Sequence, residues 1–349
     1  MPTAITRKQL FKQLKYDLIG KDSYRGVTLT YSWLANQFGH FSLGFVPCFF
    51  AYHALKKYTH WQQPGLYASL IIAAVWLLFE LYNFLGPLLL KTSKHAKKNA
   101  SGNYTFAPAW ANIAYDTAID VCFFWIGAFT MGNAVTSQPL IYNTLLILIV
   151  LVLYPSYDWY TTKMYQQAAN YPFQFRLSQW NMMINDANKA VVKEFIANAA
   201  SDKHLLVFGE NKSGKTSLCV AIANELSITH HRCSYTTAMK LFSLFFEAAI
   251  DTNQPKCLDL WAWQHASLLI IDDINPGLPV KSNLVTPQDF YTFLDNNLQS
   301  ETNKKALRES SVIWVLGNQE TDNDKMNNWI DLLQKIGVNT NDISSIDLS

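Results

Sequence analysis

Four long apolar stretches before residue 162 constrain the fold of this chain more than any other feature. Each is long enough to cross a hydrocarbon core of about 30 Å, which takes roughly 20 helical residues. We therefore expect an all-α transmembrane bundle over residues 27–162, after a cytoplasmic N-terminal segment over 1–26. For the first and third stretches, which are more polar, buried helices of a soluble domain are the alternative. The four expected spans cover about residues 28–55, 66–90, 113–135 and 140–160.

Lysine and arginine residues gather on alternate sides of these stretches. The segment before the first stretch carries six of them, and four more follow the second stretch. Only two follow the first stretch, and none lies between the third and the fourth. Because cytoplasmic loops are enriched in these residues, both termini are expected in the cytoplasm, at a bacterial-type inner membrane. The first stretch begins too late and is too long for a cleavable signal peptide.

Four carboxylates lie within these stretches. Asp116 and Asp120 share one face of the third, Glu80 lies in the inner half of the second, and Asp158 lies near the end of the fourth. The expected topology places all four toward the inner leaflet. Ionisable groups at membrane depth usually face a bundle interior, water or a partner. One hypothesis is a cation or proton site, or a polar seam between subunits. The interpretation that we favour is that Asp116, Asp120 and Asp158 reach the membrane interface and only Glu80 is buried.

The second half of the chain has the composition of a soluble domain. The formal net charge is only +2, and charged residues, 15% of the chain, concentrate after residue 162. Residues 163–200 are expected to form a linker with an amphipathic helix, because apolar residues recur at helical spacing from Trp180 to Ile196. This helix packs on the following domain or, alternatively, lies on the membrane surface. A globular domain is expected over 201–336 and a flexible polar tail over 337–349.

Residues Gly209 to Thr216 read G-E-N-K-S-G-K-T, a complete G-x-x-x-x-G-K-[ST] phosphate-binding loop. In such a loop the backbone N–H groups point at phosphate oxygens, Lys215 approaches the β- and γ-phosphates, and Thr216 offers a hydroxyl to Mg²⁺. An apolar run precedes the loop and a helical pattern follows it, which argues against a chance glycine-rich turn. The expected nucleotide-binding residues are Gly209, Glu210, Asn211, Lys212, Ser213, Gly214, Lys215, Thr216 and Ser217.

A second apolar run, from Ser267 to Asp273, ends in two acids. A buried parallel strand presents such carboxylates at its C-terminal tip. Asp272 is expected to hold Mg²⁺ together with Thr216, and Asp273 to polarise the attacking water as a general base. A third run ends in Asn318, which is expected to contact the γ-phosphate or the lytic water. Ordinary turn chemistry is the alternative for Asn318. The expected catalytic residues are thus Asp273, Lys215 and Asn318.

In their order, these segments resemble the DnaC/IstB-type branch of AAA+ ATPases, which comprises helicase loaders and transposition helper ATPases. The phosphate loop, the Tyr-Thr-Thr-Ala sequence at 235–238 and the L-L-I-I-D-D strand carry the resemblance, which covers about residues 179–336. It implies an α/β P-loop NTPase fold, an αβα sandwich with the strand order typical of AAA+ domains. It also implies ATP and Mg²⁺ as ligands and activity through oligomers. Signatures of ABC transporters (L-S-G-G-Q) and of GTPases (N-K-x-D) are absent from the sequence.

The chain departs from the family pattern at the arginine that reaches a neighbour's γ-phosphate. The equivalent stretch, 329–335, has no arginine, so Arg308 is the candidate, with an ordinary exposed arginine as the alternative. A helical lid domain is not expected either. Nucleic acid is not an expected partner, because Lys304, Lys305 and Arg308 form at most a small cluster and no basic stripe is present. The five cysteines show no C-x-x-C pairing, so they predict no metal site.

The sequence therefore predicts a membrane-anchored ATPase that binds and hydrolyses ATP with Mg²⁺ to drive or gate an oligomeric membrane assembly. Its expected partners are the lipid bilayer and further copies of itself or subunits of a larger complex. One of these would supply the missing arginine. Two alternatives stay open. The chain could be a channel or structural subunit in which nucleotide only stabilises the oligomer, or a membrane-tethered ATPase that handles DNA.

Overall fold

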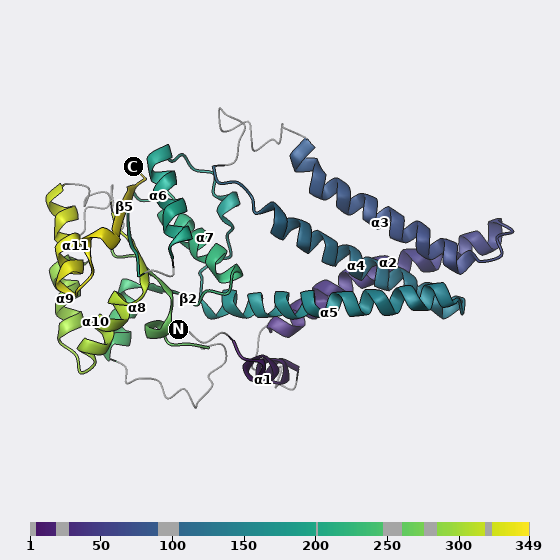
Figure 1. The fold of residues 1–349 in the computed structure, drawn as a ribbon, viewed down its shortest axis with the longest axis horizontal. Helices are drawn as coiled ribbons and strands as arrows, with labels where there is room; N and C mark the ends of the chain where they lie inside the picture. The colour runs from purple at the N-terminus through teal and green to yellow at the C-terminus, as the bar shows by residue number, and fades with distance from the viewer. Residues whose placement is uncertain are drawn as a thin grey trace. The chain divides into compact units, whose positions relative to one another are not determined.

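The computed structural model describes residues 5–18, 28–89, 105–199, 202–246, 260–275, 285–317 and 323–348 (Figure 1). These residues form two compact units, and the boundary between them falls inside one helix, α5. The described residues between 5 and 103 and between 108 and 161 form the helical unit. The described residues between 105 and 107 and from 162 onward form the α/β unit.

Long helices build the helical unit. Within the described part of the chain, three are long and apolar enough to cross a membrane, over Pro64–Gly86, Trp110–Val135 and Pro139–Ala168. The helix at the first expected span is 30 residues long but is not among these three, because polar residues such as Gln37 and His40 interrupt its apolar sequence. The helices are α1 (Arg7–Leu18), α2 (Leu29–Tyr58), α3 (Pro64–Leu89), α4 (Trp110–Val135) and α5 (Pro139–Ala168).

Helices α2 and α4 approach until their backbones touch. A Cβ added to Gly44 would collide with the carbonyl oxygen of Phe124, and one added to Gly127 would collide with that of Phe41. This reciprocal contact leaves no room for a side chain at either glycine. Small residues at such crossings let helices pack closely where no hydrophobic effect drives them together. The sequence of α2 and α4 therefore specifies where they cross.

A buried carboxylate joins α1 to the rest of the helical unit. Asp17 is 2% exposed and accepts hydrogen bonds from Gln13 Nε2 at 2.9 Å, from Thr30 N at 3.0 Å and from Thr30 Oγ1 at 2.8 Å. Thr30 Oγ1 also lies 2.8 Å from the hydroxyl of Tyr160. The carboxylate is satisfied by neutral donors, as buried polar groups usually are. It ties α1 to the start of α2 and to α5.

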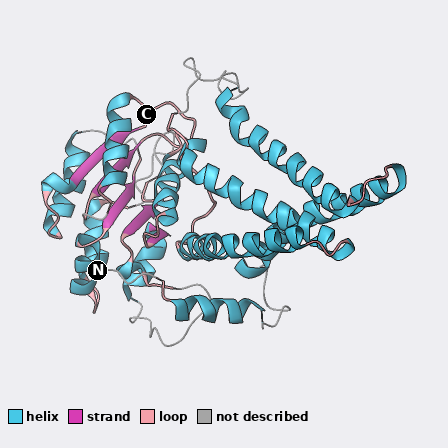
Figure 2. Ribbon diagram, turned by 45° about the vertical axis from the view of Figure 1, so that its right-hand side comes forward, coloured by secondary structure: helices cyan, strands magenta, loops and turns pink. Residues whose placement is uncertain are grey.

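The second half of the chain folds as an α/β unit around one parallel sheet of five strands, drawn in magenta in Figure 2. The strand order is β2-β3-β4-β1-β5. Strand β4 is hydrogen-bonded between β3 and β1, and β5 pairs with the outer side of β1. The strands are β1 (His204–Phe208), β2 (Cys233–Thr237), β3 (Leu268–Asp272), β4 (Ser311–Val315) and β5 (Ile343–Asp347).

Helices cover both faces of this sheet. Leu205 and Val207 of β1 pack with α6 and α7, whereas Leu206 and Phe208 pack with the helices of the opposite face. A strand buried on both faces reads as a continuous apolar run, which is why the sequence of β1 has no polar alternation. The helices are α6 (Asp186–Ala197), α7 (Lys215–Ile228), α8 (Ala238–Phe246), α9 (Pro287–Asp295), α10 (Ser300–Arg308) and α11 (Asn323–Lys335).

The amphipathic helix expected before the α/β domain is shorter than the apolar spacing suggested. It begins at Asp186, because the side chain of Asn185 caps it by accepting from Asn188 N at 2.7 Å. Trp180 therefore lies before the helix rather than in it. Val192 and Phe195 of α6 are buried in the same core as Leu205. The helix thus packs on the α/β unit, and its apolar face does not lie on a membrane surface.

The expectation of a flexible polar tail over 337–349 is wrong for most of that segment. Residues Ile343–Asp347 form β5, whose backbone pairs in parallel with β1. Ile346 is 2% exposed and packs in the core, while Ser344 and Ser345 are exposed. An edge strand needs few apolar side chains because its backbone hydrogen bonds and one buried residue hold it, so its composition resembles that of a tail.

Candidate functional site

The loop between β1 and α7 lies at the carboxyl edge of the parallel sheet. Gly214 is the N-cap of α7 and has a left-handed conformation, with φ +87°. A Cβ at this position would collide with the sulfur of Met182. The first N–H groups of α7 have no acceptor within the helix, and the helix dipole is positive at this end. The loop and the helix N-terminus together offer a binding site for an anion.

Three donors hold the carbonyl group of Gly214. It accepts hydrogen bonds from Leu218 N at 2.9 Å, from Ser217 Oγ at 2.9 Å and from Trp180 Nε1 at 3.2 Å. Trp180 is 1% exposed. The sequence placed Trp180 in an amphipathic helix and missed this role, since no spacing rule links a residue to a loop 34 positions later. Trp180 therefore anchors the loop from outside the phosphate-loop motif.

Lys215 folds back over its own loop. Its Nζ donates to the carbonyl oxygens of Gly209 and Glu210, both at 2.7 Å, and the side chain is 7% exposed. Burial lowers the pKa of Lys215, while the charge of Asp272 acts in the opposite direction. Phosphate oxygens can replace these two neutral carbonyls as acceptors, which fits an anion site.

The other expected loop residues surround this lysine. The hydroxyl oxygen of Ser213 is buried and has no hydrogen-bond partner among the described residues, so it is a further polar group for a ligand. Thr216 and Ser217 are partly buried in the first turn of α7, and Gly209 is buried at the end of β1. Glu210, Asn211 and Lys212 are exposed.

Asp272 is held at the end of β3 by two donors. Its Oδ2 accepts from the hydroxyl of Tyr235 at 2.8 Å, and its Oδ1 accepts from the backbone N–H of Asp273 at 2.8 Å. The carboxylate is 2% exposed. Desolvation, followed by the charge of Asp272, raises the pKa of Tyr235, so the phenol stays a donor. The sequence did not predict this contact, which depends on the pairing of β2 with β3.

Asp273 follows β3 in a strained backbone conformation. Its φ is +54°, a region that non-glycine residues seldom occupy and that often marks functional sites. The side chain is exposed, and desolvation together with the charge of Asp272 raises the pKa of its carboxyl group. A carboxylate with a raised pKa beside a fixed one is suited to accept a proton.

The loop and the acidic strand converge although β4 separates β1 from β3. The charge of Asp272 acts on Lys215 and on Cys219 in the second turn of α7, so the three groups share one end of the sheet. Asn318, the third expected catalytic residue, lies outside the described residues.

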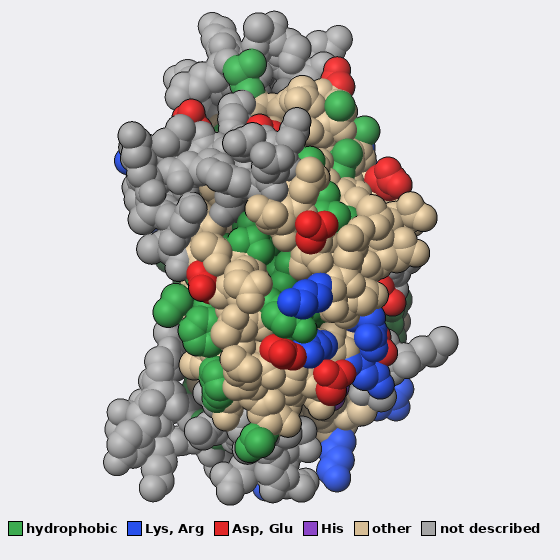
Figure 3. All heavy atoms as spheres, turned by 90° about the vertical axis from the view of Figure 1, so that its left-hand side faces the viewer, with side chains coloured by type: hydrophobic (Ala, Val, Ile, Leu, Met, Phe, Trp, Pro, Cys, Tyr) green, Lys and Arg blue, Asp and Glu red, His purple; other side chains and the backbone are tan. Residues whose placement is uncertain are grey.

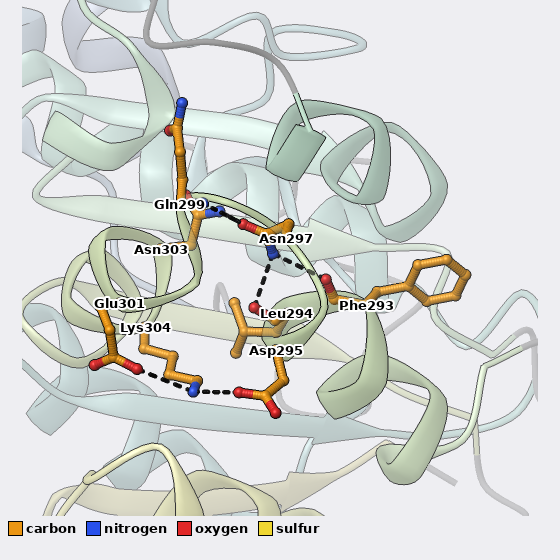
Figure 4. Close-up of polar contacts among 8 residues, drawn as sticks. All are labelled: Phe293, Leu294, Asp295, Asn297, Gln299, Glu301, Asn303 and Lys304. Atoms are coloured by element: carbon orange, nitrogen blue, oxygen red, sulfur yellow. Dashed lines mark hydrogen bonds and ion pairs between the residues drawn. The ribbon is translucent and has the colours of Figure 1, made fainter.

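Two lysines of the small basic cluster on α10 lie beside acidic side chains. Lys304 Nζ bonds to Asp295 and lies 3.2 Å from Glu301 Oε1 (Figure 4), and Lys305 Nζ lies 4.0 Å from Glu309. The hydrogen bond to Asp295 raises the pKa of Lys304. Lysine and arginine side chains lie among acidic ones on the face of the α/β unit in Figure 3. Among the described residues of this face, acidic side chains thus accompany the basic ones.

Arg308 is exposed at the end of α10, just before β4 begins. Because the strands are parallel, this is the amino edge of the sheet, whereas the loop and Asp272 lie at the carboxyl edge. A five-residue strand spans about 16 Å, so Arg308 is remote from the candidate site of its own chain.

In comparisons with known proteins, no protein-family model and no curated protein matches the chain.

Proposed function

We propose that this chain is a membrane-anchored ATPase of the AAA+ type, with Mg²⁺-ATP bound at the loop that precedes α7. One observation carries the proposal. Lys215 and Asp272 come from segments that β4 separates, yet they converge at the carboxyl edge of one parallel sheet. Phosphate binding needs the first group and Mg²⁺ binding needs the second.

The described residues suggest a role for each part of the site. The N–H groups of the loop and the ammonium of Lys215 bind the β- and γ-phosphates, and Thr216 and Asp272 hold Mg²⁺. Asp273 accepts the proton of the attacking water. The donors of Tyr235 and Trp180 fix Asp272 and the loop in place before nucleotide arrives. Such preorganisation is what a phosphoryl-transfer site requires.

Membership of the DnaC/IstB-type branch is part of this proposal. Its support is the strand order, in which β4 separates the loop strand from the acidic strand, as the AAA+ resemblance implies. Asn318, which lies outside the described residues, is proposed to contact the γ-phosphate. The paired state of Lys304 argues against DNA as the partner, so the assembly that ATP drives or gates is proposed to be an oligomeric membrane complex.

ATP binding and turnover by purified full-length protein test the proposal. Lys215→Ala is expected to lose nucleotide binding. Asp273→Asn is expected to keep it and to lose turnover by about 100-fold or more. Lys193→Ala, an exposed lysine on α6, is the matched control and should change neither. If the wild type assembles with nucleotide but does not hydrolyse it, the scaffold alternative replaces the motor. If Lys215→Ala binds ATP normally, the site itself is wrong.

The membrane topology is proposed to include α2 as a fourth span, with both termini in the cytoplasm. The support is the placement of lysine and arginine, together with the 30-residue length of α2. Reporter fusions after residues 62 and 137 are expected outside the cytoplasm, and fusions after residues 100 and 175 inside it. A cytoplasmic signal after residue 62 would contradict the span assigned to α2.

A further inference from the structure

A histidine and an aspartate meet inside the helical unit. His40 Nε2 on α2 lies 3.2 Å from Asp120 Oδ1 on α4, and the two side chains are 20% and 24% exposed. The contact is fixed by the close crossing of the two helices. Gly44 lies one turn after His40, and its partner Gly127 lies about two turns after Asp120. The touching backbones of this crossing keep the two side chains within reach of each other.

Aromatic rings enclose one side of this pair. The imidazole of His40 meets the ring of Phe124 edge to face, with centroids 4.8 Å apart. Trp76 on α3 stacks on the ring of Phe124, with centroids 4.3 Å apart. The indole of Trp76 also donates its Nε1–H to the carbonyl oxygen of Leu43 at 2.8 Å. These rings keep water from that side of the pair and strengthen the electrostatic interactions within it.

The charges that act on the pair are negative. Asp116, one turn before Asp120, acts on both His40 and Asp120, and Glu80 on α3 acts on Asp120. On α5, the carboxylate of Asp158 acts on Tyr115 instead. Asp120 and Asp116 therefore act on the imidazole, and Asp116 and Glu80 act on Asp120. Like charges at close range in a medium of low polarity repel each other, and a bound proton relieves this repulsion.

Two buried polar atoms beside the pair have no partner among the described residues. They are Nδ1 of His40 and Oε1 of Gln37. Gln37 is 6% exposed and lies one turn before His40 on the same side of α2. Buried polar atoms almost always have a hydrogen-bond partner, so this pair of acceptors points to a ligand that carries a positive charge or a hydrogen.

We propose that the His40–Asp120 pair is a proton-binding site of the helical unit. In the deprotonated state a neutral imidazole donates its Nε2–H to the carboxylate of Asp120. One proton from water then adds to Nδ1, giving an imidazolium that keeps the same bond to Asp120, so the charge of the cluster rises by one. A divalent metal ion fits less well, because no group of three or more His, Cys, Asp or Glu side chains among the described residues is placed to hold one.

The pH dependence of diethyl pyrocarbonate modification tests this site, because the reagent acylates a histidine in its neutral form and not as the imidazolium. Full-length protein in lipid nanodiscs is treated at pH values from about 4 to 9, and the His40 peptide is quantified by mass spectrometry. One titration step is expected. In Asp120→Asn its midpoint moves to lower pH, with proton affinity reduced about tenfold, because the imidazolium loses its counter-charge.

Two further variants complete the test. Asp116→Asn is expected to move the midpoint in the same direction by less, and it keeps the proposal testable where Asp120→Asn does not fold. Asp158→Asn is the control and should leave the midpoint unchanged. A wild-type His40 whose reactivity has no titration step would overturn the proposal. So would a midpoint that neither Asp120→Asn nor Asp116→Asn alters. ATP turnover is not measured here, so failure of this site is distinct from failure of the proposed ATPase.

Discussion

His204 lies buried as a neutral imidazole at the start of β1. Its Nδ1 accepts from Trp314 Nε1 at 3.1 Å, and burial lowers its pKa from 6.5 to about 4. The unfolded chain thus binds a proton below pH 6.5 that the folded chain excludes until about pH 4. Stability of the α/β unit is therefore expected to fall as pH drops through this window, by about 3 kcal/mol in total.

Thermal unfolding at a series of pH values between about 4 and 7 measures this effect. His204→Asn retains an acceptor where Nδ1 lies but does not titrate, so its unfolding temperature should fall less steeply over the same range. Equal slopes for the two proteins would show that His204 does not carry the pH dependence.

Tyr235, which lies outside the L-L-I-I-D-D sequence, positions the carboxylate of Asp272. Its hydroxyl donates to Asp272 Oδ2 at 2.8 Å, and a hydrogen bond to a charged group contributes about 1.5–3 kcal/mol. Tyr235→Phe removes this donor without changing the ring. We expect the Mg²⁺ concentration for half-maximal ATP turnover to change at least severalfold, whereas Tyr291→Phe on α9 leaves it unaltered. An unchanged Mg²⁺ dependence in Tyr235→Phe would remove Asp272 from the proposed metal site.

At the scale of elements, the crossing of α2 with α4 offers a matched pair of glycines. A Cβ on Gly44 would collide with a backbone carbonyl of α4, whereas no described atom lies within 4 Å of a Cβ on Gly39. Gly44→Ala is expected to destabilise the helical unit by about 2 kcal/mol, through overpacking. Gly39→Ala should be neutral or stabilise α2 by up to about 1 kcal/mol. Thermal unfolding in detergent compares them, and equal stability of the two variants would contradict the crossing.

The elements that the sequence predicted well are those whose burial is complete. Strands β1, β3 and β4 read as continuous apolar runs because both of their faces are covered. Strand β5 was missed because an edge strand with two exposed serines has the composition of a tail. The proposed phosphate loop could be predicted because all of its expected residues are consecutive in the sequence. The roles of Tyr235 and Trp180 could not be predicted. The contact of Tyr235 with Asp272 depends on the pairing of β2 with β3, and the contact of Trp180 with Gly214 depends on how the segment before α6 folds against the loop.

The partners of the carboxylates in the helical unit also could not be predicted from the sequence. Helical periodicity alone placed Asp116 and Asp120 on one face. The contact of His40 with Asp120 became evident only from the register of α2 against α4, which the glycines set. The spacing of residues in the sequence thus predicts which side chains share a face of a helix. Which residue of a neighbouring helix faces them depends on where the two backbones cross, and the sequence alone did not show this.

At the scale of the whole molecule, the site is proposed to be completed by a second copy of the chain. Arg308 is exposed at the amino edge of the sheet, about 16 Å from the carboxyl edge that holds Lys215 and Asp272. It cannot serve the site of its own chain, but it can reach that of a neighbour if subunits pack edge to edge. An arginine supplied in this way contributes about 1,000-fold or more to turnover.

Mixing two inactive variants tests this arrangement. Arg308→Ala retains an intact loop and acids, and Asp273→Asn retains its arginine, so each alone is expected to have little turnover. In mixed oligomers some interfaces combine the acids of the first variant with the arginine of the second, and ATP turnover should recover to roughly a quarter of the wild-type rate in a dimeric interface. Arg308→Lys, which keeps the charge but not the planar guanidinium, should remain slow. Full activity of Arg308→Ala alone would assign the arginine to another protein, whereas no recovery on mixing would show that Arg308 does not act at a neighbour's site and that its loss impairs folding.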